Sequence, residues 1–216
     1  MLYEQFKARA EGVSAEVFKF ATKAEALEHL IVFLRTEGLA DTPQATALWA
    51  ECSFLDGIDR DAVAVNAGLK FGVTRELAAH ARFGISQMEW ALADTGSLAQ
   101  NSTAIEQRLV SSLSTIHIAL VPTSGILPDM PTLLAKVHPG DCAYLAMITG
   151  PSRTADIERV LTIGVHGPER LVIIFVNELS GPPLPTSPRL GEEKTPSPSG
   201  GGLGRGKNGN DMGGNK

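Results

Sequence analysis

The chain has 216 residues, 43% of them hydrophobic, which is enough for one sizeable domain with its own core. Its formal net charge is −5, with acidic and basic residues interspersed, so no basic surface indicates a nucleic-acid partner. The two cysteines, Cys52 and Cys142, lie far apart, so we expect neither a zinc site nor a cysteine-ligated iron–sulfur cluster in this chain.

The first forty residues contain three predicted elements. Residues 2–12 form a short helix, and residues 16–20 alternate apolar and polar side chains as a strand does. Thr22 and Glu25 have the spacing of a capping box, and apolar residues then recur every three or four positions. This pattern predicts an amphipathic helix that extends to Gly38.

The middle of the chain carries weaker patterns. Short strands are predicted near residues 45–49 and 85–86, and helical periodicity is present near residues 75–82 and 87–93. We expect the existence of these elements to be better predicted than their ends.

From residue 114 onward the patterns predict an α/β fold. Residues 117–121, 142–148 and 171–176 are apolar on both faces, which is typical of strands in a sheet covered on both sides. Helical patterns at residues 130–137 and 152–161 separate these strands. A β-α-β-α-β series of this kind predicts a mostly parallel sheet covered by helices on both faces, with right-handed crossovers.

The turn after the second of these strands is the best candidate ligand site in the sequence. Ligands of open α/β sheets bind at the carboxyl ends of strands, and free N–H groups at a helix start bind anions. A small phosphorylated or carboxylated metabolite is the expected ligand; the other interpretation is a capping Ser or Thr beside a surface arginine. The ligand-binding residues predicted here are Thr149, Gly150, Ser152, Arg153, Thr154 and Asp156.

Three residues are candidates for general acid–base catalysis: Asp94, Glu158 and His166. Asp94, with Thr95 and Gly96 as further ligand-binding candidates, follows a predicted helix and either acts as a base or caps a turn. His166 is either a base or ligand, or a hydrogen-bonded residue that holds a turn. Because it precedes the last strand, we expect it at the opposite end of the sheet from Arg153.

Two further polar residues, Arg108 and His117, stand beside apolar segments. Arg108 is the last ligand-binding candidate. The two residues either contribute to the anion site or are a surface residue and a strand-start residue.

Four segments together resemble the LUD-domain family in their order and spacing, over roughly residues 10–178. These segments are ALADTGSL, SSLSTIHIALV after Arg108, ITGPSRTADIE and GVHGPERLVIIFV. Asp94 to Ser97 stand where the family usually has Glu-Thr-Gly-Thr, so the carboxylate is one methylene shorter here.

The resemblance implies a fold similar to that of ribose-5-phosphate isomerase, glucosamine-phosphate deaminase and the CoA-transferases. It also implies a part in oxidising L-lactate to pyruvate, beside a cysteine-rich subunit and an iron–sulfur subunit that carry the redox centres. This chain is then a non-redox subunit of an electron-transfer complex. The alternatives are a stand-alone enzyme or sensor that binds a small anionic metabolite at a Ser152–Asp156 helix start, and a purely structural interaction module.

The two ends of the chain differ in character from its middle. No apolar run reaches the roughly 18 residues that a membrane span needs, and the first residues carry charges throughout, so we expect a soluble cytoplasmic protein. After Ser180 the sequence is rich in Gly and Pro and poor in large apolar residues. We therefore predict one α/β domain over residues 1–180 and a disordered tail over residues 181–216, either dispensable or a polyproline-type ligand segment.

Overall fold

A six-stranded parallel sheet forms the centre of the structure. The computed structural model describes residues 1–137, 142–155, 161–163 and 167–181, and every structural statement below concerns these residues. Each pair of neighbours in the sheet is parallel. Its strands, in spatial order, are β1 (Glu16–Phe20), β12 (Arg170–Val176), β7 (Ile116–Pro122), β4 (Phe83–Gln87), β2 (Ala47–Trp49) and β3 (Leu69–Lys70).

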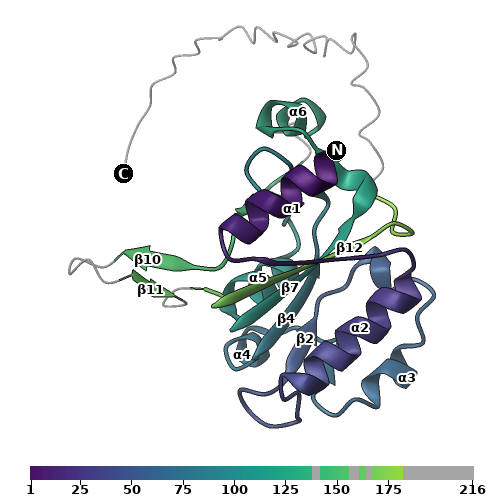
Figure 1. Cartoon of the computed structure of the whole chain (residues 1–216). Coiled ribbons are helices and arrows are strands. Elements are labelled where there is room, and N and C mark those ends of the chain that lie inside the picture. Colours follow the sequence, from purple (N-terminus) through teal and green to yellow (C-terminus); the bar gives the residue numbers. More distant parts are fainter. Residues whose placement is uncertain (138–141, 156–160, 164–166, 182–216) are drawn as a thin grey trace, which may run out of the picture. The chain divides into compact units, whose positions relative to one another are not determined.

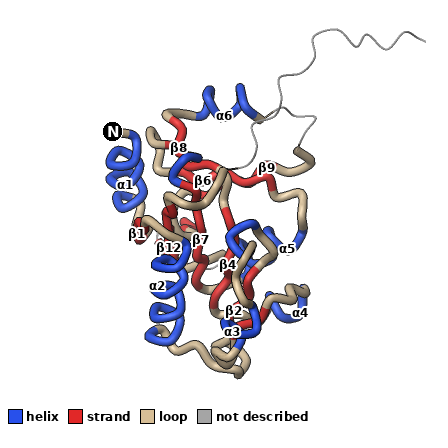
Figure 2. Tube along the Cα trace, turned by 90° about the vertical axis from the view of Figure 1, so that its right-hand side faces the viewer, coloured by secondary structure: helices blue, strands red, loops and turns tan. Residues whose placement is uncertain are grey.

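Helices cover both faces of this sheet, as Figures 1 and 2 show. Alternate residues of β12 point to opposite faces: Val172 and Ile174 pack in the cluster that contains Leu30, whereas Ile173 and Phe175 pack with Phe6. The predicted α/β class, with a mostly parallel sheet covered on both sides, is confirmed. One face carries α2 (Lys23–Thr36) and α3 (Arg60–Ala64), and the other carries α1 (Leu2–Gly12), α4 (Arg75–Ala78) and α5 (Ile105–Leu113).

The elements near the amino terminus form where the sequence predicts them. α2 begins with the capping box, in which the Thr22 hydroxyl accepts a hydrogen bond from the Glu25 backbone N–H and the Glu25 carboxylate accepts one from Thr22. The helix ends at Thr36, and Gly38 follows with a φ of 89°. No described helix is long and apolar enough to cross a membrane.

A second, four-stranded sheet lies against the face that carries α1. Its strands, in spatial order, are β8 (Ile126–Leu127), β5 (Trp90–Leu92), β6 (Ser97–Asn101) and β9 (Leu145–Ile148). Ala91 and Leu98 pack into the cluster with Phe6, whereas Trp90 and Leu92 pack under α6 (Met130–Lys136). This sheet is therefore a layer between the central sheet and α6.

Two sequence predictions are wrong in this second sheet. Residues 87–93 do not form a helix, because Trp90 to Leu92 alternate between two packed layers, the period of a strand. Residues 142–148 do not form a strand of the central sheet. Only Leu145–Ile148 are a strand, which pairs antiparallel with β6, and its side chains are at most half-buried.

The predicted helix over residues 152–161 is also wrong in the part of this range that the structure describes, which leaves out residues 156–160. β10 (Arg153–Ala155) and β11 (Leu161–Ile163) pair antiparallel, with Arg153 opposite Ile163. Thr and Ile favour strands, which explains how local pairing prevails over the acidic helix-start pattern here. The predicted β-α-β-α-β series is thus replaced by direct pairing of β7 with β12, and the chain between them passes through the second sheet and the β10–β11 pair.

Candidate functional site

The predicted ligand residues at Gly150 and Arg153 hold the end of α1. Gly150 has a φ of 71°, and a side chain there would place its Cβ 2.6 Å from the Val13 carbonyl oxygen. Arg153 Nη2 donates to the same Val13 oxygen at 2.9 Å and to Ser14 Oγ at 2.9 Å. Arg153–Ala155 form a strand and not the start of a helix, and the binding of an anion by these residues stays a prediction.

The two glycine-containing segments around Ser152 and Gly167 meet in space. The Ser152 N–H donates to the Pro168 carbonyl at 2.8 Å, and a Cβ on Gly167 would lie 3.1 Å from Ser152 Cβ. The antiparallel pair thus returns the chain to its starting point, and the expectation that His166 lies at the opposite end of the sheet from Arg153 stays a prediction. His166, Asp156 and Glu158 lie outside the described residues, as does the side chain of Thr154.

The Asp94, Thr95, Gly96 motif is the turn between β5 and β6. Asp94 and Thr95 are exposed, whereas Gly96 is buried against α1, where a Cβ would lie 2.5 Å from the Ala10 nitrogen. Next to this turn, Ser97 Oγ lies 2.7 Å from Thr149 Oγ1. The motif and the Gly150 segment thus both contact the carboxyl-terminal part of α1, and the role of Asp94 as a base stays a prediction.

A cavity of about 400 Å³, lined mostly by polar residues, lies at the carboxyl edge of the central sheet. Parallel strands end at a common edge, and ligands of open α/β sheets bind at such edges. The cavity lies where the chain leaves β2, β4 and β12, and β6 and α5 supply the rest of its wall. Its lining residues are Glu51, Cys52, Ser53, Gln87, Glu89, Gln100, Asn101, Ala104, Gln107, Ser180 and Gly181.

Glutamine side chains tie the wall of this cavity together. Gln100 Nε2 donates to Gln107 Oε1 at 2.8 Å, and Gln107 Nε2 donates to the Glu51 carbonyl oxygen at 2.6 Å. Gln87 Oε1 accepts from the Ser53 hydroxyl at 3.1 Å. With their amides committed to these bonds, the side chains keep one orientation, which preorganises the wall for a ligand.

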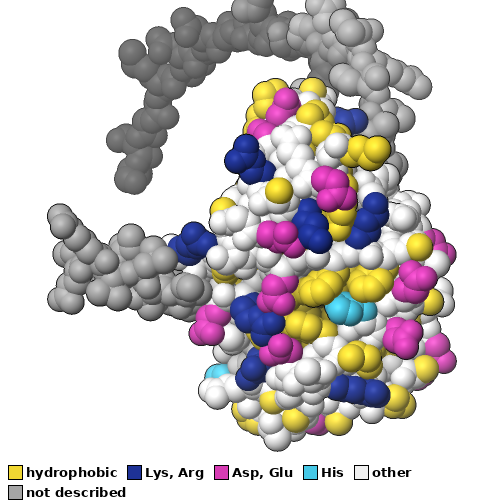
Figure 3. All heavy atoms as spheres, viewed as in Figure 1, with side chains coloured by type: hydrophobic (Ala, Val, Ile, Leu, Met, Phe, Trp, Pro, Cys, Tyr) yellow, Lys and Arg dark blue, Asp and Glu magenta, His cyan; other side chains and the backbone are white. Residues whose placement is uncertain are grey.

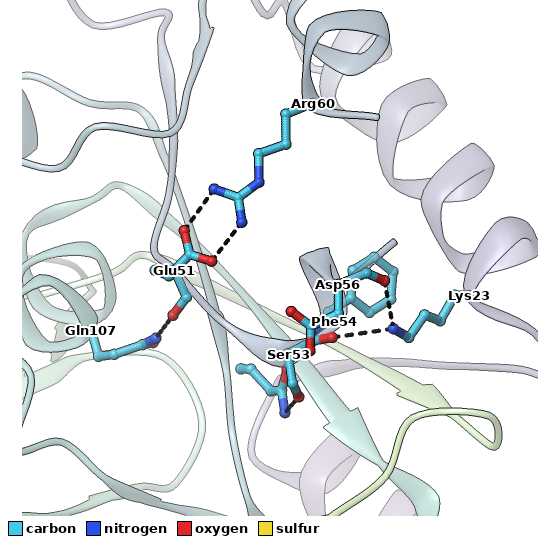
Figure 4. Close-up of polar contacts among 8 residues, drawn as sticks. Lys23, Glu51, Ser53, Phe54, Asp56, Arg60 and Gln107 are labelled. Carbon is cyan, nitrogen blue, oxygen red and sulfur yellow. Dashed lines mark hydrogen bonds and ion pairs between the residues drawn. The ribbon is translucent and has the colours of Figure 1, made fainter. Parts of the chain in front are cut away.

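The cavity is lined by two carboxylates, Glu51 and Glu89, and Arg60 neutralises the first of them. It forms a bidentate pair with Glu51, at 2.7 and 2.6 Å, as Figure 4 shows. Nearby, Lys23 Nζ donates to the carbonyl oxygens of Ser53 and Asp56 at 3.1 and 3.2 Å and so fixes the loop after β2. The Glu51 charge is therefore compensated, and no such cation faces Glu89 among the described residues.

Glu89 is the group in the cavity best suited to exchange a proton. Burial raises the pKa of its carboxyl to about 7, although the Asn101 N–H donates to Glu89 Oε2 and favours the charged form. A carboxyl with a pKa near neutrality acts as either a general acid or a general base. The sequence does not reveal Glu89, because the helical periodicity of residues 87–93 hides its position two residues beyond the end of β4.

His117, by contrast, is a core residue. It is fully buried in β7, and its Nε2 lies 2.8 Å from Ser86 Oγ. Burial lowers the pKa of the imidazole to about 3, so the ring is neutral at physiological pH. This residue takes no part in the predicted anion site, in agreement with its interpretation as a strand residue.

The surface charge indicates no extended electrostatic interface on the face drawn in Figure 3. Acidic and basic side chains alternate there and neither sign gathers into one patch. In the described part of the chain, no group of three or more His, Cys, Asp and Glu side chains is placed to hold a metal ion.

Replacing Glu89 by glutamine should make the protein more stable at neutral and alkaline pH. The pKa of Glu89 is raised from 4.5 in the unfolded chain to about 7 in the folded one. The contribution of protonated Glu89 to the free energy of unfolding is therefore complete below pH 4.5 and is lost as the pH rises through 7. After a reduction for solvent screening, we expect the wild type to lose about 2 kcal/mol more than the variant between pH 5 and 8. Urea unfolding at several pH values measures this difference.

The matched control is Glu28→Gln, which removes an exposed carboxylate from α2. Its stability curve should follow the wild-type curve. Parallel curves for wild type and Glu89→Gln would show that Glu89 is not protonated in the native state near neutrality.

Comparison with known proteins gives one family and two kinds of relative. The family model described as the LUD domain matches residues 3–176. Lactate utilization protein C of Bacillus licheniformis is 38% identical over 107 residues, which cover 47% of this chain and 45% of the relative. Lactate utilization protein C of Bacillus subtilis is 38% identical over 108 residues, with the same coverage. The chain thus aligns with less than half the length of these curated relatives.

A solved structure shares the fold. The crystal structure of a DUF162 family protein from Deinococcus radiodurans matches with a TM-score of 0.55 and 18% identity, over 81% of this chain and 96% of that one. At this identity the likeness establishes the fold alone.

Proposed function

The chain belongs to the LUD domain family, and from this we propose that it is a component of an L-lactate oxidation system, acting with iron–sulfur partner subunits and carrying no redox centre itself. The observation that carries the proposal is the 38% identity to proteins named lactate utilization protein C. The family match spans residues 3–176 and so includes the central sheet, the second sheet and all residues that line the carboxyl-edge cavity except Ser180 and Gly181.

The cysteines of the chain support the assignment of the redox centres to partners. Only Cys52 and Cys142 are present, whereas a cysteine-ligated cluster takes four thiolates. Burial raises the pKa of the Cys52 thiol, which disfavours the thiolate that a metal requires. A cysteine-rich subunit and an iron–sulfur subunit then carry the electrons from L-lactate, and this chain acts beside them.

Deleting the gene for this chain tests the proposal. We expect the deletion strain to lose growth on L-lactate as the only carbon source, to grow normally on glucose, and to recover when the full chain is supplied from a plasmid. L-lactate-dependent pyruvate formation in cell extracts gives the biochemical readout. Unchanged L-lactate oxidation in the deletion strain would remove the chain from this system.

A second candidate function, a stand-alone enzyme or sensor of a small metabolite, is favoured by Glu89. A half-buried carboxyl with a pKa near 7 in a cavity of about 400 Å³ at a strand edge is a typical acid–base arrangement. Thermal shift measurements with small hydroxy and keto acids test it. A compound that stabilises the wild type and not Glu89→Gln supports this function, and the absence of any such compound counts against it.

A further inference from the structure

We propose that a second, smaller cavity beside Arg108 binds a small oxyanion, a carboxylate or a phosphate, through the Arg108 guanidinium. The cavity has a volume of about 200 Å³ and lies between α5 and β9. It is separate from the carboxyl-edge cavity, since Arg108 does not line that cavity. The inference does not depend on a role in lactate oxidation.

Three side chains of α5 line one wall of this cavity. Arg108, Ser111 and Ser112 have the i, i+3, i+4 spacing that places side chains on one face of a helix. The opposite wall is Tyr144 with the strand β9. The Ser111 hydroxyl donates to the Arg108 carbonyl oxygen at 3.3 Å. The wall on α5 therefore offers the Arg108 guanidinium and the Ser112 hydroxyl as donors to an anion.

The charge of Arg108 has no anionic partner in the part of the chain that the structure describes. No carboxylate lies within ion-pair distance of it there, and its Nε is buried without a hydrogen-bond partner. Its guanidinium carbon lies 4.9 Å from the centre of the Tyr144 ring, which orients the group but accepts none of its N–H donors. No hydrogen bond donated by the terminal N–H groups of Arg108 is present among the described residues either, so an oxyanion in the cavity supplies an acceptor to the guanidinium.

Two further features lie near this cavity: the free edge of β9 and the segment that contains Ser152. β9 is the last strand of its sheet and pairs only with β6 among the described strands, so its other edge has backbone groups without ladder partners. A side chain on Gly167 would approach Ser152 Cβ to 3.1 Å and the Ser112 carbonyl oxygen to 3.9 Å. The segment that resembles the family pattern therefore packs directly against the helix that carries Arg108.

The size of the cavity limits the ligand to a few heavy atoms. One water molecule takes up about 30 Å³ in the liquid, so about 200 Å³ accommodates a molecule of roughly six heavy atoms. Lactate, pyruvate and inorganic phosphate all fall in this range. A small monocarboxylate and inorganic phosphate are thus the two kinds of oxyanion that the experiment must distinguish.

Isothermal titration calorimetry of the full chain tests the proposal, with L-lactate, pyruvate and inorganic phosphate as separate probes at constant ionic strength. We expect at least one probe to bind, and Arg108→Gln to weaken it about 10-fold to 100-fold, because a hydrogen bond to a charged group contributes about 1.5–3 kcal/mol. The probe that binds identifies a carboxylate or a phosphate site. Arg75→Gln, which removes an exposed arginine from α4, should leave the affinity unchanged.

A second variant guards against misfolding of Arg108→Gln. Ser112 is exposed at the rim, so Ser112→Glu should fold and should abolish binding by placing a negative charge beside the anion. Failure of all three probes to bind the wild type, or equal affinity in Ser112→Glu, overturns the proposal. Both outcomes are independent of growth on L-lactate, so the proposed function is tested separately.

Discussion

Replacing Gly84 by alanine is expected to lower the free energy of unfolding by about 3 kcal/mol. Gly84 lies in β4 directly under α5, and a Cβ there would lie 2.0 Å from the Val110 carbonyl oxygen and 2.6 Å from Ser114 Oγ. The nearer atom belongs to the helix backbone, so a rotamer change cannot relieve the contact and α5 must move. For a domain of this size, the melting temperature should fall by about 6–12 °C.

The matched control is Gly72→Ala, because a Cβ at Gly72 meets nothing within 4 Å. Urea unfolding and thermal melts of both variants measure the difference. A melting temperature of Gly84→Ala within a degree of the control would mean that α5 does not rest on β4 as closely as described. Because α5 also carries Arg108, any displacement of the helix should weaken oxyanion binding in Gly84→Ala as well.

The sequence predicts best where short-range contacts determine the structure. The capping box fixes the start of α2 through two hydrogen bonds within four residues, and that helix forms as predicted. β1 and β12 are likewise predicted nearly to the residue. β1 has the alternation of a strand and β12 is a run of apolar β-formers, so the sequence of each segment alone indicates a strand.

The sequence predicts poorly where a second layer decides which faces are buried. Trp90–Leu92 form a strand because Trp90 and Leu92 meet α6 while Ala91 meets the layer under α1. Neither partner is close in the sequence. The same error hid Glu89, whose function as a candidate acid or base depends on its position just beyond β4 and not on any local motif.

The family pattern identifies residues that are important without showing why. Gly96 and Gly150 were predicted as ligand residues, yet in the structure each allows the backbone to approach the carboxyl-terminal part of α1. Arg153 contacts the same part of the chain. Glycine is required at these positions because a Cβ would clash with the neighbouring backbone, a reason that does not involve a ligand. Arg153 donates to a carbonyl and a hydroxyl, whereas no side-chain hydrogen bond of Arg108 is present among the described residues, which is why the oxyanion proposal rests on Arg108.

Replacing His117 by glutamine is expected to remove a large acid sensitivity of the fold. The pKa of this buried imidazole is lowered from 6.5 to about 3, so in moderately acidic solution the unfolded chain binds a proton that the folded chain does not. The contribution of neutral His117 to the free energy of unfolding is complete above pH 6.5 and is lost as the pH falls towards 3. Relative to His117→Gln, the wild type should lose about 2 kcal/mol by pH 5 and about 3 kcal/mol by pH 4.

The wild type must be compared with a variant, because Glu89 changes the free energy of unfolding in the opposite direction to His117 over the same pH range. Lowering the pH from 7 to 5 protonates Glu89 in the folded state and stabilises it, whereas His117 makes the same change destabilising. The two contributions are each about 2 kcal/mol, so the wild type alone should show a nearly flat stability between these pH values. Urea unfolding of His117→Gln should then show stability rising as the pH falls, and Glu89→Gln should show it falling. His80→Gln, at an exposed histidine, is the control; if both single variants follow the wild-type curve, neither group is titrating as its burial implies.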